Sequence, residues 1–139
     1  MLAKLLVIIF CILPLNAYAL EVFFEPEIVR ESALFIKCST NLPDMTNVSV
    51  VLLNKELDYS HKIDAVVRDG TFQCGPFQYL GKSLPAGNYT TEIMTGPAML
   101  QPESVQGTIG SKGQHLRGGL VRKGMFGRAV YLRLDFGLL

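Results

Sequence analysis

TFQCGPFQYLGKSLPAGNYTTEI, residues Thr71–Ile93, carries the clearest strand and turn signals of this sequence. An alternating strand begins at its first residue. Gly75-Pro76 ends or bends that strand, because proline has no N–H to donate to a central ladder. Residues 81–87 then read as a loop, and Asn88–Thr95 as the next strand. The stretch therefore predicts two strands joined by a loop.

Upstream of this stretch, apolar and polar residues alternate with the period of a half-buried strand. The alternation covers residues 34–39 and 63–68, and a run rich in valine and leucine covers residues 47–53. Asp69-Gly70 stands between two alternating runs, and Asp-Gly in that setting is a strong hairpin signal. We therefore predict that Ile63–Arg68 and Thr71–Cys74 pair as a hairpin.

Downstream, Gly96–Gly127 is an irregular excursion that contains most of the 13 glycines. Residues 101–106 favour one helical turn, with proline near its first position and glutamate in its first turn. Residues 120–123 favour a short strand, and Arg128–Phe136 alternates again as the last strand. The glycine spacing matches neither a dinucleotide-binding fingerprint nor a phosphate-binding loop.

Seven or eight short strands with turns between them predict an all-β fold, an antiparallel β-sandwich of about seven strands. The Pro-x-Gly-x-Tyr pattern at residues 85–89 resembles the corner found in immunoglobulin-like and fibronectin-type sandwiches. That resemblance implies that Tyr89 is a structural corner whose hydroxyl bonds back to the preceding turn. An ordinary half-buried strand aromatic is the alternative interpretation of Tyr89.

Residues 1–19 predict a cleaved signal peptide. Lys4 supplies a positive charge near the start, residues 5–15 are apolar, and Ala17-Tyr18-Ala19 places small residues where a signal peptidase reads them. The apolar run is too short for a spanning helix, so no transmembrane segment is expected after cleavage. The chain is therefore expected to be periplasmic or secreted.

Cys11 leaves a lipoprotein interpretation open, although Phe10 stands where a lipoprotein box has a small residue. Residues 20–139 are then a single domain, long enough for one core but not for two. Taken together, these features are similar to those of small exported bacterial proteins of immunoglobulin-like type.

Cys38 and Cys74 remain after cleavage, and two cysteines in an exported chain predict one disulfide. Such a bridge would stabilise the fold by about 3–4 kcal/mol. A metal ligand or a catalytic thiol is the alternative, but the sequence has no CxxC pair. Whether the bridge would join the two sheets or only neighbouring strands stays open.

The two histidines do not predict an active site. His61 lies in a polar segment and His115 in the glycine-rich excursion, and a GxSxG nucleophile motif is absent. Two isolated histidines do not supply the three or four ligands of a zinc site. We therefore expect surface histidines and a protein without catalytic residues, metal or cofactor. An envelope hydrolase is the least favoured interpretation.

Charge divides along the chain although the mature chain is neutral, since loss of Lys4 leaves equal numbers of basic and acidic residues. Neutrality argues against nucleic acid as the main partner. Acidic residues dominate residues 20–69, and basic residues dominate residues 110–139. This asymmetry either directs an acidic partner to one edge or is cancelled because the two segments are neighbours.

A long loop on a β-scaffold is a common place for binding residues. The candidate binding surface runs from Lys112 to Arg128, with Leu116, Leu120, Met125 and Phe126 as apolar anchors. Its polar members are Lys112, His115, Arg117, Arg122, Lys123 and Arg128. A purely structural crossing from one sheet to the other is the alternative.

The sequence thus predicts a non-enzymatic binding or accessory module of an envelope complex, whose partner is another envelope or secreted protein. The alternative is a small secreted inhibitor or toxin-neutralising protein that acts on an extracytoplasmic enzyme through residues 112–128. The Asn-x-Ser/Thr sequons at Asn47 and Asn88 matter only in a host that glycosylates exported proteins.

Overall fold

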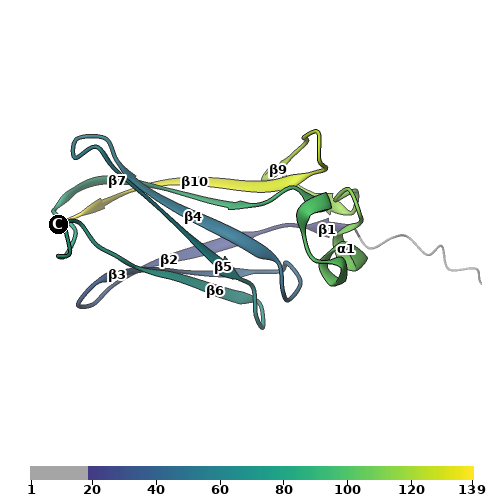
Figure 1. Ribbon diagram of the computed structural model, residues 1–139, viewed down its shortest axis with the longest axis horizontal. Coiled ribbons are helices and arrows are strands. Elements are labelled where there is room, and N and C mark those ends of the chain that lie inside the picture. The colour runs from purple at the N-terminus through teal and green to yellow at the C-terminus, as the bar shows by residue number, and fades with distance from the viewer. Residues whose placement is uncertain (1–18) are drawn as a thin grey trace, which may run out of the picture.

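The computed structural model describes residues 19–139, so the predicted signal peptide lies outside the described residues apart from Ala19. The structure is 54% strand and 8% helix, which confirms the predicted all-β class. Figure 1 shows its strands in two layers, with the C-terminus at one end and the short helix α1 (Glu103–Ile109) at the other. Both main sheets are antiparallel throughout.

The larger sheet has the strand order β5-β4-β7-β10-β9. Its members are β4 (Asn47–Asn54), β5 (Tyr59–Val66), β7 (Gly87–Thr95), β9 (Val121–Arg122) and β10 (Ala129–Leu138). β10 pairs with β7 from Tyr131 to Leu138 without a register shift. On its other side, β10 pairs with β9 only at Ala129 and Val130.

The smaller sheet has the order β2-β3-β6, formed by β2 (Phe24–Arg30), β3 (Leu34–Thr40) and β6 (Thr71–Phe77). The sequence predicted β3 and β6 but not β2, because Pro26 in its middle weakens a strand signal. Two further segments, β1 (Leu20–Glu21) and β8 (Leu116–Arg117), pair in parallel.

The core lies between the two layers because alternate residues of each strand point inward. On β4 the inward residues are Val48, Val50 and Leu52, each at most 1% exposed. From the smaller sheet, Ile36 and Phe77 enter the same cluster and are fully buried. The period-two pattern of residues 34–39 therefore identifies the buried face of β3, whereas the run at 47–53 is apolar on both faces of β4.

The predicted hairpin of Ile63–Arg68 with Thr71–Cys74 is wrong beyond its first rung. Arg68 and Thr71 exchange two backbone hydrogen bonds of 2.9 and 3.0 Å around Asp69-Gly70, whose φ angles are 51° and 75°. After that rung, β5 pairs with β4 and β6 pairs with β3. The tight turn thus carries the chain from one sheet to the other, since a turn signal is local and does not choose strand partners.

The excursion at 96–127 is more regular than predicted. It begins with a 3-10 turn, η1 (Ala98–Leu100), and continues into α1, which includes most of the predicted helical turn at 101–106. α1 extends to Ile109 because Val105 and Ile109, four residues apart, are both buried on one face. Within residues 19–139, no helix has the length and apolar character needed to cross a membrane.

Candidate functional site

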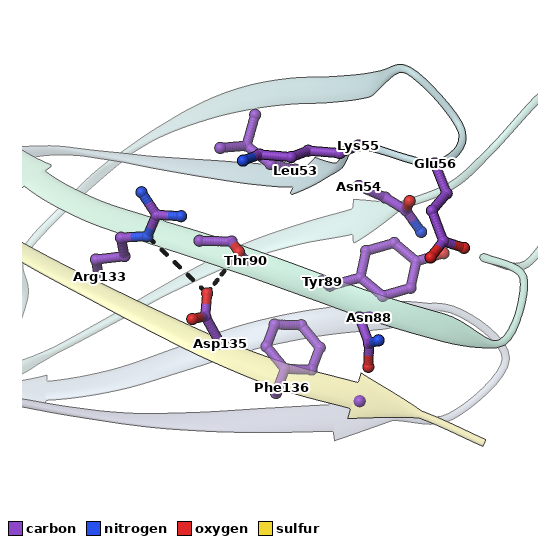
Figure 2. Close-up of a pocket in the computed structure, with 11 residues that line it drawn as sticks. Leu53, Asn54, Lys55, Glu56, Asn88, Tyr89, Thr90, Arg133, Asp135 and Phe136 are labelled. Atoms are coloured by element: carbon purple, nitrogen blue, oxygen red, sulfur yellow. Dashed lines mark hydrogen bonds and ion pairs between the residues drawn. The ribbon is translucent and has the colours of Figure 1, made fainter.

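The surface is hollowed at the ends of β4, β7 and β10 by an open depression of about 600 Å³ (Figure 2). Within it, Asp135 Oδ1 accepts a 2.6 Å hydrogen bond from Thr90 Oγ1 and lies 3.9 Å from Arg133 Nε. Neither histidine and neither cysteine lines this depression. The depression therefore holds one ion pair within β10 and one hydrogen bond that joins β10 to β7.

The predicted binding residues lie instead at the other end of the molecule, on the second half of the excursion (Figure 1). Two of them hold the loop together. Arg128 Nη1 donates to the Leu116 carbonyl at 2.9 Å, and His115 Nδ1 lies 3.0 Å from the Thr108 carbonyl oxygen. These two side chains are tied to backbone within the excursion.

The other four basic residues differ in whether their side chains are hydrogen-bonded. Arg122 Nη1 donates to the Gly119 carbonyl at 2.6 Å and so closes its own turn. Lys112, Arg117 and Lys123 are exposed, and within residues 19–139 their side chains have no hydrogen bond or ion pair. These three cations are therefore the part of the predicted surface that is available to a partner.

Four large apolar side chains are exposed beside them. Met99 and Leu100 of η1 are 46% and 69% exposed, and Met125 and Phe126 of the loop before β10 are 90% and 52% exposed. The two segments adjoin, because the Met99 N–H donates to the Phe126 carbonyl at 3.1 Å. Of the predicted apolar anchors, Leu116 is instead a core residue, 1% exposed.

We call this combination the loop surface: Met99, Leu100, Lys112, Lys123, Met125 and Phe126. Lys112 belongs to it because its carbonyl accepts the Arg128 N–H at 2.9 Å, directly after Phe126-Gly127. Sequence reasoning missed Met99 and Leu100, which precede the helix and show no periodicity. The signal that could have found them is an apolar pair in a loop that otherwise reads as polar.

Two glycines allow the two halves of the excursion to approach one another. A Cβ at Gly127, which has φ 98°, would lie 2.9 Å from the Lys112 carbonyl oxygen. A Cβ at Gly113, with φ 70°, would lie 3.1 Å from the Ala98 Cβ. Both distances are too short for an ordinary side chain, so glycine is required where η1, Lys112 and the loop before β10 pack together.

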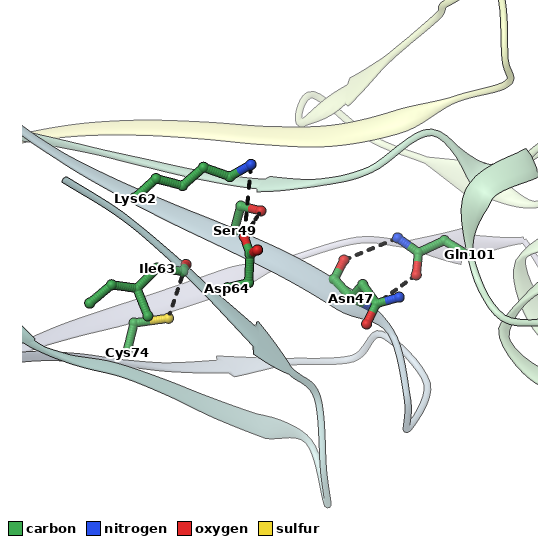
Figure 3. A network of polar contacts seen from close by, with 7 residues as sticks. All are labelled: Asn47, Ser49, Lys62, Ile63, Asp64, Cys74 and Gln101. Carbon is green, nitrogen blue, oxygen red and sulfur yellow. Dashed lines mark hydrogen bonds and ion pairs between the residues drawn. The ribbon is translucent and has the colours of Figure 1, made fainter. Parts of the chain in front are cut away.

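Gln101 fixes the excursion to the larger sheet (Figure 3). Its side-chain oxygen accepts the Asn47 N–H at 2.8 Å, and its side-chain nitrogen donates to the Asn47 carbonyl at 3.0 Å. The Gln101 carbonyl accepts in turn from Gln106 Nε2 at 2.9 Å. Gln101 is 5% exposed, and its amide replaces a strand rung at the start of β4. No sequence motif predicts this contact.

The predicted Cys38–Cys74 disulfide is not formed in the structure, where both residues are free buried thiols. The two lie on neighbouring strands but are offset: Cys38 faces Phe72, and Cys74 faces Ile36. Such a diagonal separation is longer than a disulfide usually spans. Each thiol has its own hydrogen-bond acceptor. For Cys38 this acceptor is the Ser39 carbonyl oxygen, 3.4 Å from Sγ.

Cys74 Sγ lies 3.7 Å from the Ile63 carbonyl oxygen of β5, so this thiol touches the other sheet (Figure 3). Burial raises the pKa of Cys38 to about 12 and that of Cys74 to about 11. Thiols with such pKa values are poor nucleophiles and poor metal ligands at neutral pH.

The predicted corner at Tyr89 is present as a hydrogen bond. Tyr89 Oη donates to the Pro85 carbonyl at 2.7 Å, and the side chain is 1% exposed. Its ring stacks on Phe136 of β10, with centroids 6.0 Å apart. Tyr89 is therefore buried, not half-buried, and it ties the loop before β7 to the larger sheet.

The charge asymmetry is not cancelled by ion pairs in the described part of the chain. The ion pairs there, Lys62–Asp64 and Arg133–Asp135, each lie within one strand and are solvent-exposed. The acidic and basic segments are also neighbours where Glu21 of β1 pairs with Arg117 of β8.

His61 is exposed as predicted, and its ring packs edge-on against Phe77, with centroids 5.8 Å apart. Among residues 19–139, no three histidine, cysteine or carboxylate side chains are grouped closely enough to hold a metal ion. No protein-family model matches the chain, and no significant match was found among the curated proteins or the solved structures.

Proposed function

We propose that this chain is a non-enzymatic, exported binding module that serves as an accessory part of an envelope complex, and that the loop surface contacts its partner. The observation that carries the proposal is the group of exposed apolar side chains Met99, Leu100, Met125 and Phe126 beside unpaired lysines. Contiguous apolar groups exposed on a soluble domain, rimmed by polar residues, are typical of protein interaction sites.

The chemistry of the loop surface defines the kind of partner it suits. Methionine side chains adapt to irregular apolar surfaces, and phenylalanine supplies a large area for burial. Lys112 and Lys123 favour a partner with carboxylates around an apolar centre. A second envelope or secreted protein with such a patch fits this description.

Residues 1–19 support export, and the corner at Tyr89 supports an immunoglobulin-like subtype of the fold. The positive start, apolar run and Ala-x-Ala boundary of residues 1–19 support signal-peptide cleavage and a periplasmic or secreted location. The bond from Tyr89 Oη to the Pro85 carbonyl supports an immunoglobulin-like corner, as do two facing antiparallel sheets.

The test is crosslinking of the tagged, exported protein in cells, followed by identification of captured proteins. Met125→Asp is expected to reduce capture of the main partner by about tenfold or more, because it places a charge in a buried contact. The matched control is Leu80→Asp, since Leu80 is also exposed, at 83%, but lies in the turn between β6 and β7. Equal capture by both variants would contradict the role of the loop surface.

The claim that the module is non-enzymatic has a separate test. A hydrolase screen on the purified protein is expected to show no turnover that depends on either histidine. Activity lost in a His61→Ala or His115→Ala variant would overturn the claim, whatever the crosslinking result.

The alternative, an inhibitor of an extracytoplasmic enzyme, is favoured by one observation. The excursion is held by the Gln101 and Arg128 bonds, and a preformed loop binds with a smaller ordering cost. In that case the captured partner is an enzyme whose activity falls on binding, and residues 112–128 become protected from proteolysis in the complex.

A further inference from the structure

The outer edge of β10 can be located from two hydrogen bonds of neighbouring residues. The Val130 N–H donates to Thr95 Oγ1 of β7 at 2.9 Å, and the Tyr131 N–H donates to the Leu120 carbonyl, beside β9, at 2.9 Å. Main-chain groups of successive strand residues point to opposite sides. Even-numbered residues of β10 therefore bond toward β7, and odd-numbered residues point away from it.

From this alternation, Arg133, Asp135 and Gly137 present their N–H and C=O groups to the open side. The β7 ladder continues to Leu138, whereas β9 ends its pairing at Val130. Within residues 19–139, no strand pairs with these three residues on that side. The edge therefore offers a row of unpaired main-chain groups.

The inward side chains along this edge are apolar and incompletely covered. They are Leu132, Leu134, Phe136 and Leu138, each of intermediate exposure. On β7, by contrast, the inward residues Tyr89 and Ile93 are at most 1% exposed. An added strand with apolar residues at alternate positions would cover this row as β10 covers β7.

The other sheet edges carry proline or lysine, which discourage strand addition, and β10 carries neither. Pro26 stands in the middle of β2, Gly75-Pro76 interrupts β6, and β5 exposes Ser60, His61 and Lys62 in succession. β10 has no proline, no lysine, no register shift against β7 and no inward charge. Natural sheets usually protect an edge of this length.

We propose that the outer edge of β10 is a self-association site, at which a second copy of this chain adds its own β10 in antiparallel orientation. A two-fold axis then lies at Phe136, and the two larger sheets join into one. This surface is separate from the loop surface and does not depend on its role.

Two alternative registers are disfavoured by the residues present. A two-fold axis at Leu134 would place Gly137 opposite Tyr131 of the second copy, where the Leu120 carbonyl already bonds. An axis at Asp135 would set the two Asp135 carboxylates directly opposite each other, and like charges in that position are destabilising.

The axis at Phe136 avoids both conflicts. It pairs Asp135 with Gly137 of the second copy through outward main-chain groups, so no like charges face one another. On the inner side it sets Leu134 against Leu138 of the second copy and Phe136 against its own symmetry mate. The apolar row of each strand is thereby covered by the apolar row of the other, which is why a second copy fits this edge.

The first experiment measures the mass of the purified exported protein by light scattering and sedimentation over a wide concentration range. A reversible monomer–dimer equilibrium is expected. Amide hydrogen exchange then locates the contact: Asp135 and Gly137 should gain protection as the dimer forms. Leu132 and Leu134, bonded to β7, should be protected at every concentration and serve as internal controls.

The matched variants are Asp135→Pro and Asp135→Ala. Both lose the bond to Thr90, but only proline removes the outward N–H, and an edge strand tolerates proline at such a position. Asp135→Pro should weaken dimerisation by about tenfold or more relative to Asp135→Ala, since each dimer loses two hydrogen bonds.

A chain that stays monomeric at the highest concentration would overturn the proposal. So would a dimer in which the Asp135 and Gly137 amides exchange as fast as in the monomer, or one that Asp135→Pro leaves as tight as Asp135→Ala. Exchange on the unmodified protein keeps the test valid even if Asp135→Pro fails to fold. Met125→Asp should leave the dimer unchanged, which separates this result from the loop surface.

Discussion

Two threonines on the inner face of β7 show how single buried polar atoms affect this fold. Thr91 is fully buried, and within residues 19–139 its hydroxyl has no hydrogen-bond partner. Thr95, on the same face, uses its hydroxyl to accept the Val130 N–H at 2.9 Å. The threonine hydroxyl is therefore destabilising at position 91 and stabilising at position 95.

We expect Thr91→Val to raise the free energy of unfolding by about 1 kcal/mol, because an unpaired buried hydroxyl is replaced by a methyl group. Thr95→Val should lower it by about 1–2 kcal/mol, because the Val130 N–H loses its acceptor. Urea unfolding of both variants measures the difference. Equal changes of the same sign would contradict the assignment.

The buried cysteines lead to a second expectation. Free, buried thiols should not react with a disulfide reagent near neutral pH in the folded protein, and two thiols per chain should react in denaturant. The assay is thiol titration without reductant, checked by intact mass. If no thiol reacts in denaturant until a reductant is added, the disulfide predicted from the sequence has formed after all.

The same thiols make stability depend on alkaline pH. Burial raises the pKa of Cys38 from 9.0 to about 12 and that of Cys74 from 9.0 to about 11. Between pH 9 and these values the unfolded chain holds fewer protons than the folded chain, so stability falls as pH rises. Each thiol contributes a slope of up to about 1.4 kcal/mol per pH unit.

The measurement for this slope is urea unfolding at a series of pH values above 9. Cys74→Ala is the comparison, because subtraction cancels the lysine and tyrosine titrations that both proteins share. The variant should show the shallower decline in its free energy of unfolding. An identical decline in both proteins would show that Cys74 is not protonated and buried as described.

At the scale of elements, the excursion depends on side chains that replace backbone ladders. Gln101 satisfies both main-chain groups of Asn47, and Gln106 then bonds the Gln101 carbonyl. Because these contacts lie at the start of β4, they join η1 and α1 to the sheet. They act together with the bond from the Met99 N–H to the Phe126 carbonyl, which holds η1 beside the loop before β10.

We expect Gln101→Ala to lower the free energy of unfolding by about 1–3 kcal/mol, because the Asn47 groups lose buried partners. Amide exchange should rise first in α1. Gln114→Ala is the control: Gln114 is exposed and accepts one bond, from the Lys112 N–H at 2.9 Å, which water can replace. A larger loss in Gln114→Ala than in Gln101→Ala would contradict the assignment.

At the scale of the whole molecule, two sheets share one core and are joined by the connection around Val67, which is fully buried. Phe77 of the smaller sheet is also fully buried, and it meets the His61 ring of the larger sheet. Because side chains of both sheets are buried in this one core, disrupting either sheet exposes apolar side chains of the other. We therefore expect the domain to unfold as one unit.

Phe77→Ala is expected to lower the free energy of unfolding by about 3–5 kcal/mol. Unfolding should remain a single transition, with exchange in β4 and β6 changing together. Phe126→Ala, at an exposed position, should change stability by about 0.5 kcal/mol or less. Separate transitions for the two sheets would contradict a shared core.

Much of the strand content could be predicted because its cause is local. Alternation at residues 34–39 and 128–136, and the valine-rich run at 47–53, correspond to β3, β10 and β4. The Tyr89 bond was also predictable, since Pro85 and Tyr89 are only four residues apart. β2 was missed because a proline in a strand is tolerated at an edge, which the local sequence does not reveal.

The candidate site was predicted only in part. Lys112, Lys123 and Met125 are exposed on the loop surface, whereas Leu116, His115 and Arg128 serve the packing of the excursion. Met99 and Leu100 join the surface through a backbone bond to Phe126, across a separation in sequence that no periodic pattern bridges.

The sequence by itself determined the all-β class and most strand positions and indicated the corner at Tyr89, because each follows from residues a few positions apart. Only the tertiary structure decided strand partners: the Asp69-Gly70 turn joins two sheets, the cysteines are offset, and one edge of β10 is open. These features depend on which distant segments bury one another's apolar faces, and that choice is made by the packed core as a whole.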